Sequence, residues 1–452
     1  MEHMSASASV TEHRESREHD VVVRRALQIP ALRIILIAAL SIRALVAVLA
    51  FARDTTSSPD TLTYVRPAES LVAVGRFDSY GAPELSRTPG YPMLLAIGEA
   101  AGHLVPVTLA LQVLLNTATV FGVAALALAL GTSTRVATIG AALYAFEPSS
   151  IVYVSEVMTE TLFTAVITAL LIVLTCWVRT RETRLLLAGS LLLAAGSFVR
   201  PILYIVPAPL AALIGVIAWR HHGARSRALA HAALFFIIAA TPIAAWRARN
   251  TLVAGYDRFA AITDINLLYY RAAGVLARRS GQAIDSVQLR LRREWGADTS
   301  LSAVGRTARG RERTSRYYGM RAQAREILVN DPPAVAMDAL AGASRTVLGR
   351  DTSEWSELLG LQPGSSGWQL VRITLTLLWH PMVALGLLGL WRGGLNGYVL
   401  LPVLLASVYL VTAAAGPEAY SRFRLAIVPV VAVLAACGAV YVWDRVRPRL
   451  SS

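Results

Sequence analysis

The chain has 452 residues, of which 55% are hydrophobic and 16% are charged, and its formal net charge is +14. Soluble domains carry roughly 25% charged residues, so this composition excludes an ordinary soluble protein. The chain contains no lysine, so its Lys+Arg total is entirely arginine. An arginine excess is typical of the loops of membrane proteins, and we therefore expect no nucleic acid as a partner.

About ten apolar segments follow one another along the chain, most of them near the roughly 20 residues that cross a bilayer as a helix. Backbone groups in hydrocarbon must be bonded internally, so we predict an all-α, polytopic membrane helical bundle. We expect spans at about residues 31–52, 105–131, 135–154, 158–178, 185–199, 202–219, 229–246, 370–391, 398–414 and 425–443. The apolar stretch at residues 91–102 is too short to cross and predicts a helix lying in the membrane interface.

The polar segments between these spans suggest how the chain is divided. We predict a disordered cytoplasmic tail at 1–30, an N-terminal transmembrane bundle at 31–246 with a first extracytoplasmic loop at 53–104, an extracytoplasmic cover at 247–368, C-terminal transmembrane helices at 369–443 and a cytoplasmic tail at 444–452. Residues 316–349 of the cover are predicted to be helical, with a break at Asp331-Pro332-Pro333.

Short arginine-rich segments set the expected orientation. With an even number of spans, both termini share a side with the segments at 179–184, 220–227 and 445–449, which are rich in arginine. The positive-inside rule makes that side cytoplasmic. We therefore expect a multi-pass protein of a bacterial plasma membrane, with its candidate residues gathered on the extracytoplasmic face.

The first loop contains a candidate general base. Asp60 and Tyr64 stand four residues apart and share one face of a helix that begins after Pro59. Asp60 is either the carboxylate that takes a proton or simply the cap of this helix. Asp54 and Asp78 are rival carboxylates in the same loop.

A rigid turn follows at Arg87-Thr88-Pro89-Gly90-Tyr91-Pro92, where two prolines and a glycine restrict the backbone. Arg87 either reaches lipid headgroups or holds a phosphate at the rim of the bilayer. Tyr91 begins the interfacial helix, and we include it among the candidate substrate-binding residues.

Several further charged residues lie at the outer ends of spans. Glu156 and Glu160 share a helix face, and both are expected in a polar cavity or in an ion pair with Arg200, which Pro201 holds in place. Two other pairs of residues are also candidates for the site. Arg249 and Asn250 follow Trp246 and are compatible with an interfacial aromatic belt, and Arg422 and Arg424 precede the last span. Arginines at an outer helix start run against the positive-inside trend and call for an anionic partner.

Taken in order, these motifs resemble the bacterial GT-C superfamily of membrane glycosyltransferases. The resemblance is to the branch related to protein O-mannosyltransferases and the lipid A aminoarabinose transferase (family 39 and its relatives). It rests on six features: Asp60 and Tyr64 with Ala68, the turn Arg87–Pro92, Thr159-Glu160, Arg200-Pro201, Trp246 with Arg249-Asn250 and Gly255, and Arg422-Phe423-Arg424-Leu425 with Pro429. Thr61 stands where the family often has serine, no lysine is present near the expected phosphate, and no soluble domain follows the last spans.

The resemblance implies a glycosyltransferase of the cell envelope, for example a mannosyltransferase, that moves a hexose or pentose from a polyprenyl-phosphate sugar to a glycan, protein or lipid acceptor. Asp60 would be the catalytic base in an inverting reaction. Tyr64, Arg87, Tyr91, Glu156, Glu160, Arg200, Arg249, Asn250, Arg422 and Arg424 would bind substrate.

The sequence demands no cofactor and no metal, although a carboxylate-bound divalent cation is compatible with it. Two alternatives are a polytopic lipid or small-molecule transporter or flippase, and a lipid-anchored assembly or polymerase-type component. A transporter would carry charges near the membrane midplane, whereas the charges here lie at the ends of spans.

Overall fold

The computed structural model describes residues 18–296, 311–350 and 352–450. In these ranges the regular elements are helices, apart from one short hairpin of β1 (Asp78–Ser79) and β2 (Ala82–Pro83). Within them, seven helices are long and apolar enough to cross a membrane, so the protein is an all-α, polytopic membrane protein, as predicted. They are α3 (Pro30–Ala52), α6 (Leu104–Ala129), α9 (Glu160–Thr180), α12 (Arg225–Ala254), α19 (Ser366–Arg392), α20 (Gly397–Ala414) and α21 (Val428–Leu450), which continues the 3₁₀ turn η4 (Ser421–Ile427).

Three predicted spans form shorter helices, α7 (Thr134–Ala145), α10 (Thr183–Val199) and α11 (Pro207–His222), with the 3₁₀ turn η1 (Pro201–Leu203) before α11. The prediction of one helix over 135–154 is wrong, because the chain breaks between α7 and α8 (Pro148–Val152). Pro148 has no N–H to continue the ladder. Glu147 caps the new helix by accepting hydrogen bonds from the N–H groups of Ser149 at 3.1 Å and Ser150 at 2.6 Å.

The chain extends its helices further than the sequence predicted at three places. Helix α2 (Glu18–Leu27) occupies part of the expected disordered tail, because Val22 and Ala26 are buried in the main hydrophobic core. Residues 1–17 lie outside the described part of the chain. Helix α12 continues to Ala254, so residues 247–254 are not loop, and α21 continues through the expected C-terminal tail to Leu450.

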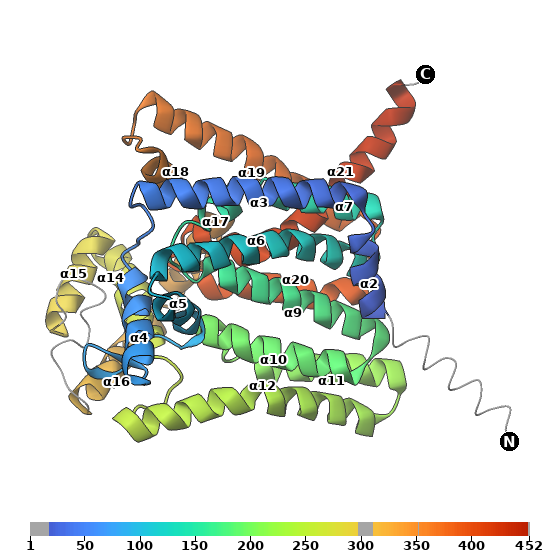
Figure 1. Ribbon diagram of the computed structural model, residues 1–452. Coiled ribbons are helices and arrows are strands. Elements are labelled where there is room, and N and C mark those ends of the chain that lie inside the picture. Colours follow the sequence, from blue (N-terminus) through green and yellow to red (C-terminus); the bar gives the residue numbers. More distant parts are fainter. Residues whose placement is uncertain (1–17, 297–310, 351, 451–452) are drawn as a thin grey trace.

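Most non-spanning elements gather at one end of the bundle, and α2 and the end of α21 lie at the other (Figure 1). These elements are α4 (Thr61–Val74), α5 (Gly90–Ala100), α13 (Ile262–Asn266), the π-helical turn η2 (Leu267–Ala272), α14 (Ala273–Ser280), α15 (Ile284–Glu294), α16 (Arg311–Val329), α17 (Pro332–Leu348) and α18 (Thr352–Leu359). The break between α16 and α17 confirms the predicted interruption at Asp331-Pro332-Pro333.

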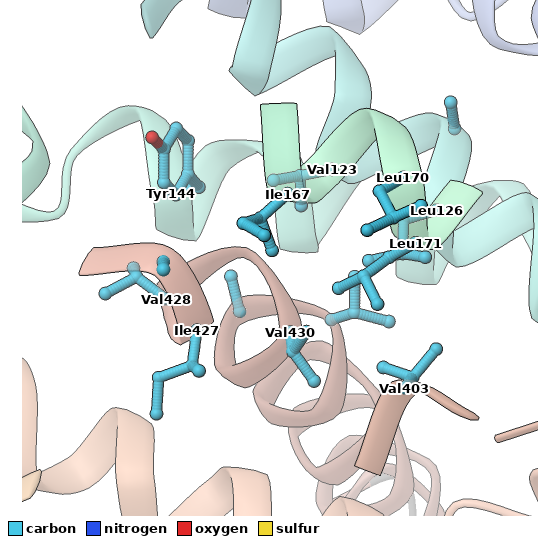
Figure 2. Close-up of a cluster of buried hydrophobic side chains, with 14 of the residues drawn as sticks. Val123, Leu126, Tyr144, Ile167, Leu170, Leu171, Val403, Ile427, Val428 and Val430 are labelled. Carbon is cyan, nitrogen blue, oxygen red and sulfur yellow. The ribbon is translucent and has the colours of Figure 1, made fainter. Parts of the chain in front are cut away.

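Buried aliphatic side chains fix how the C-terminal helices join the N-terminal bundle. Figure 2 shows Val123 of α6 and Ile167 of α9 in the same cluster as Ile427 and Val428, where η4 passes into α21. Helices α19 and α21 approach so closely that a Cβ built on Gly389 would lie 1.9 Å from the Leu434 carbonyl oxygen. This packing holds η4, and with it Arg422, against the start of α9.

Candidate active site

A cavity of about 500 Å³ lies at the end of the bundle where the non-spanning elements gather. It is lined by the start of α4, the turn before α5, the start of α9, the turn from α10 into η1, η2, the end of α20 and η4. Its polar lining includes Asp60, Thr63, Tyr64, Arg87, Thr159, Arg200, Tyr270, Arg271, Glu418, Tyr420 and Arg422. Residues from distant parts of the sequence therefore meet in one space.

Asp60 occupies the N-cap position of α4, but its side chain makes no capping hydrogen bond. Its carboxylate oxygen Oδ1 instead accepts a hydrogen bond from Arg87 Nη2 at 2.8 Å, and Oδ2 lies 3.6 Å from Arg422 Nη2. Burial alone would raise the pKa of Asp60, but Arg87 and Arg422 outweigh it, so the pKa lies below its ordinary value. Asp60 is therefore an ionised carboxylate facing the cavity at neutral pH.

The two rival carboxylates of the first loop are placed elsewhere. Asp54 is exposed at the end of α3, and Asp78 in β1 pairs with Arg76 at 2.6 Å. Neither side chain lines the cavity. Among the three candidates, only Asp60 is in position to meet a bound substrate there.

Arg87 is held by three side chains of one helix turn. Its Nε donates to Thr63 Oγ1 and its Nη1 to the Tyr64 hydroxyl, each at 2.9 Å, besides the bond to Asp60. Its guanidinium also lies over the Tyr64 ring, 4.4 Å from the centroid. The backbone N–H of Arg87 donates to Glu84 Oε1 at 2.9 Å, which fixes the turn before α5. A guanidinium restrained in this way keeps a fixed positive charge at the cavity wall.

A second ion pair forms where α9 begins and α10 ends. The Glu160 carboxylate, whose side chain is 0% exposed, pairs with Arg200, and Arg200 Nε donates to Thr159 Oγ1 at 2.8 Å. Pro201 follows Arg200 and starts η1, so the backbone turns at this point. The sequence left open whether Glu160 serves a polar cavity or an ion pair, and the structure shows the ion pair at the cavity edge.

Arg422 joins the two pairs. Its guanidinium lies 3.6 Å from Asp60 and 3.8 Å from Glu160 Oε1, beyond hydrogen-bond distance. Within the described residues Arg422 makes no hydrogen bond, and its Nε is buried without a partner. Arg422 lines the cavity and its Nη groups also make no hydrogen bond to the described residues, so acceptor oxygens of a bound ligand would satisfy them.

We call Asp60, Arg87, Glu160, Arg200 and Arg422 the charged cluster. Three guanidinium groups face two carboxylates in it, which leaves one excess positive charge. An excess charge in a partly buried site is costly unless an anion compensates it. The arrangement therefore suits a ligand carrying about one negative charge, with acceptor oxygens for guanidinium donors.

One side of the same cavity is apolar. Phe163 at the start of α9, Ile202 and Ile205 beside η1, and Leu410 of α20 line it. Ile205 is 54% exposed, which places this side next to the apolar outer surface of the bundle. The cavity thus combines an anion-compatible cluster with an apolar flank.

Six predicted site residues do not line this cavity, and one of them is Glu160, which lies in the ion pair at its edge. Arg249 donates to the carbonyl oxygens of Glu84 and Phe77, each at 2.9 Å, and so ties α12 to the first loop. Asn250 is fully buried and donates to the Arg258 and Phe259 carbonyls. Arg249 also donates to Asn250 Oδ1 at 3.0 Å, so the hydrogen bonds of these two side chains go to backbone carbonyls and to each other.

The other three are Tyr91, Arg424 and Glu156. Tyr91 is buried beneath Tyr64, with ring centroids 5.3 Å apart, and its hydroxyl donates to Gln112 at 2.9 Å. Arg424 is 2% exposed and donates to the Gly349 carbonyl and to Ser149 Oγ. Glu156 lies in the loop before α9, where burial and the nearby Glu354 and Glu160 raise its pKa to about 8. Of these three, Tyr91 packs directly against a residue of the cavity wall, Tyr64.

Several residues that line the cavity are not among the predicted site residues, including Thr63, Tyr270, Arg271 and Glu418. Thr63 lies between Asp60 and Tyr64 in the sequence, so it could have been predicted from its position beside them. Tyr270 and Arg271 belong to the long cover, where no spacing or motif distinguishes them from its other tyrosines and arginines. Within the described residues, no group of three or more His, Cys, Asp or Glu side chains has a metal-binding arrangement.

No family model and no curated protein matches the chain. Among solved structures it is similar to the oligosaccharyltransferase AglB from Archaeoglobus fulgidus, in complex with an inhibitory peptide and a dolichol-phosphate, at 13% identity and a TM-score of 0.48 over 91% of this chain and 51% of that one. It is also similar to ArnT from Cupriavidus metallidurans bound to undecaprenyl phosphate, at 13% identity and a TM-score of 0.37 over 88% and 77%. The chain spans about half the length of the oligosaccharyltransferase, and these likenesses assign it no activity.

Proposed function

We propose that the protein is a membrane glycosyltransferase that moves a sugar from a polyprenyl-phosphate donor to an acceptor hydroxyl, with Asp60 as general base. One observation carries the proposal. The unsatisfied guanidinium of Arg422 lies 3.6 Å from the Asp60 carboxylate, in a cluster with one excess positive charge beside an apolar flank. The phosphodiester of a polyprenyl-phosphate sugar carries one negative charge and an apolar tail, and it matches both features.

The donor's phosphate would lie against Arg422, with Arg200 and Arg87 nearby. During transfer, the bond between the anomeric carbon and the phosphate oxygen breaks, and its electron pair stays on the phosphate. Negative charge therefore grows where the guanidinium groups are already fixed, so they stabilise the transition state more than the bound donor. The tail would follow the apolar flank between η1 and α20, toward the lipid.

The acceptor hydroxyl would attack the anomeric carbon from the side opposite the phosphate, which inverts the configuration there. Its oxygen forms the new bond to carbon, and its proton passes to Asp60. Because the pKa of Asp60 lies below the ordinary value, the carboxylate is a weak base. Proton transfer is therefore late, when the attacking hydroxyl has become acidic.

The cover from α13 to α18 would shield this reaction from water, since η2 supplies part of the cavity wall. We place the site on the extracytoplasmic face of a bacterial plasma membrane because the arginine-rich short loops lie on the other side. The O-mannosyltransferase-like branch, transfer of a hexose or pentose, and a glycan, protein or lipid acceptor remain part of the same proposal.

The test is transfer by the purified protein in detergent. Radiolabelled polyprenyl-phosphate sugars are offered singly, with a membrane extract as acceptor. We expect label to move from one donor, and Asp60→Asn to reduce that rate by at least about 100-fold, as expected for loss of a general base. Asp54→Asn is the matched control, since Asp54 is exposed and outside the cavity.

Full activity in the Asp60→Asn variant would refute the role of Asp60. Absence of transfer and of donor hydrolysis with every donor, in a folded protein, would refute the glycosyltransferase. A lipid-flipping assay in vesicles would then be the next measurement, because a flippase is the alternative from the sequence.

A further inference from the structure

The charged cluster leaves a second polar side of the cavity unused. It is formed by the π-helical turn η2 and by the segment between α20 and η4. Turns of π-helix are rare and occur often at functional sites, because the wider turn redirects consecutive side chains. Here the turn brings both Tyr270 and its neighbour Arg271 to the cavity.

Tyr270 offers a hydroxyl that no neighbour uses. It is half-buried, and within the described residues its hydroxyl makes no hydrogen bond. Burial, the Asp60 carboxylate and Tyr420 raise the pKa of Tyr270 to about 12, so the phenol stays neutral and able both to donate and to accept. Tyr270 and Asp60 line the same cavity.

Arg271 and Glu418 form an ion pair beside it. Arg271 Nε donates to Glu418 Oε1 at 3.2 Å, and its Nη2 donates to the Ala413 carbonyl at 2.7 Å. In the described part of the chain, the second carboxylate oxygen of Glu418, Oε2, is buried without a hydrogen-bond partner. The Glu418 carboxylate lines the cavity and keeps acceptor capacity that no described residue uses, so it can accept a hydrogen bond from a ligand hydroxyl.

We propose that Tyr270, Arg271 and Glu418 form a sugar subsite, which binds the hydroxyl groups of a neutral saccharide in the same cavity as the charged cluster. This inference rests on the proposed function and adds the kind of ligand that the second polar side of the cavity binds. The saccharide is either the sugar of the donor or that of the acceptor, since both bring hydroxyl groups close to Asp60.

Charge and shape favour a neutral sugar over a second anion. The Arg271–Glu418 pair carries no net charge, in contrast to the excess positive charge of the charged cluster. A phosphate or uronate would meet the Glu418 carboxylate and be repelled. Hydroxyl groups can donate to the Glu418 carboxylate and exchange hydrogen bonds with Tyr270, and the aromatic side chains of Tyr270 and Tyr420 line the same cavity.

The experiment uses the full-length protein in detergent with the variants Tyr270→Phe and Glu418→Gln. Tyr318→Phe and Glu326→Gln are the matched controls, because both residues lie on α16 away from the cavity. Two probes are measured by equilibrium binding: undecaprenyl phosphate, which has no sugar, and a panel of methyl glycosides of hexoses and pentoses. Tyr270 loses no protein partner when it becomes Phe, so this variant is expected to fold.

We expect the wild type to bind at least one methyl glycoside, and each cavity variant to weaken that binding about tenfold, as for the loss of one hydrogen bond. Binding of undecaprenyl phosphate should stay within about twofold in both. Where transfer is measurable, the KM values of the cavity variants show which sugar occupies the subsite. A raised KM for the donor identifies the donor's sugar, and a raised KM for the acceptor alone identifies the acceptor's sugar.

The two proposals fail in different ways. A wild type that binds no glycoside, or cavity variants that bind glycosides as the controls do, would overturn the sugar subsite even if transfer occurs. Glycoside and lipid-phosphate binding without any transfer would overturn the glycosyltransferase and leave the subsite standing. A cavity variant that loses both probes equally would show a folding defect or a shared site, and would count against a separate subsite.

Discussion

Replacement of Arg422 by glutamine tests the role of the unsatisfied guanidinium most directly. The side chain is 23% exposed and lies 3.6 Å from Asp60 and 3.8 Å from Glu160, so a phosphate bound at similar range would interact with it in a partly desolvated site. A pair of unit charges about 4 Å apart at an effective dielectric constant near 20 attract by about 4 kcal/mol. Desolvation and the neighbouring carboxylates offset part of this attraction.

We therefore expect Arg422→Gln to weaken binding of undecaprenyl phosphate by about 2–3 kcal/mol, or roughly 30- to 150-fold in Kd. Folding should survive, because Glu160 keeps Arg200 and Asp60 keeps Arg87 as partners. The assay is equilibrium binding in detergent, with thermal unfolding measured alongside.

Arg66→Gln is the control, since Arg66 does not line the cavity and its contacts are an exposed pair with Glu69 on α4 and the Tyr80 ring. The difference in Kd between Arg422→Gln and Arg66→Gln should shrink as salt is added, because added ions compete for the Arg422 guanidinium. If Arg422→Gln binds undecaprenyl phosphate as tightly as Arg66→Gln does, the assignment of the lipid phosphate to the charged cluster is wrong.

Three further predictions concern protonation and packing. Arg87→Gln removes a cation that lowers the pKa of Asp60, so the acidic limb of the kcat/KM profile should move to higher pH; an unmoved limb would mean that Asp60 does not set it. The pKa of Glu156 is raised from 4.5 to about 8, so the folded state holds a proton that the unfolded state releases, and stability is lost as pH rises through this window. Glu156→Gln should therefore be more stable than wild type at pH 9, by on the order of 3 kcal/mol. At pH 4 the two proteins should differ little. Equal thermal unfolding of variant and wild type at both pH values would contradict this. Gly389→Ala should destabilise the protein by about 1–3 kcal/mol because its Cβ meets backbone of α21, whereas Gly397→Ala, with nothing within 4 Å, should not; equal unfolding temperatures would refute the close crossing of α19 and α21.

The amino-acid sequence by itself determined where most helices lie. Long apolar segments predict spans because the hydrocarbon thickness sets their length. The prolines after Asp331 predict the break between α16 and α17, because proline cannot extend a preceding helix. These signals act within a few residues, and they were sufficient for the fold class. They failed for α2, which is helical because Val22 and Ala26 find a buried surface on distant helices.

The sequence also selected the members of the charged cluster, because ionised residues at the ends of spans are costly and so are conspicuous. It could not tell which of them face a cavity. Arg249 and Arg424 look like Arg200 and Arg422 in sequence, but only the folded chain brings backbone carbonyls to the first two and leaves Arg422 without a hydrogen bond.

Tertiary structure alone decided the second side of the cavity. Tyr270 and Arg271 come from the cover and Glu418 from the segment after α20, and no local pattern links them. Their meeting depends on how η2 packs against the end of α20, which is a property of contacts between segments far apart in the chain. Hydrophobic periodicity is a local signal and predicts elements, whereas the partner of a polar side chain is set by long-range packing and becomes visible only in the folded molecule.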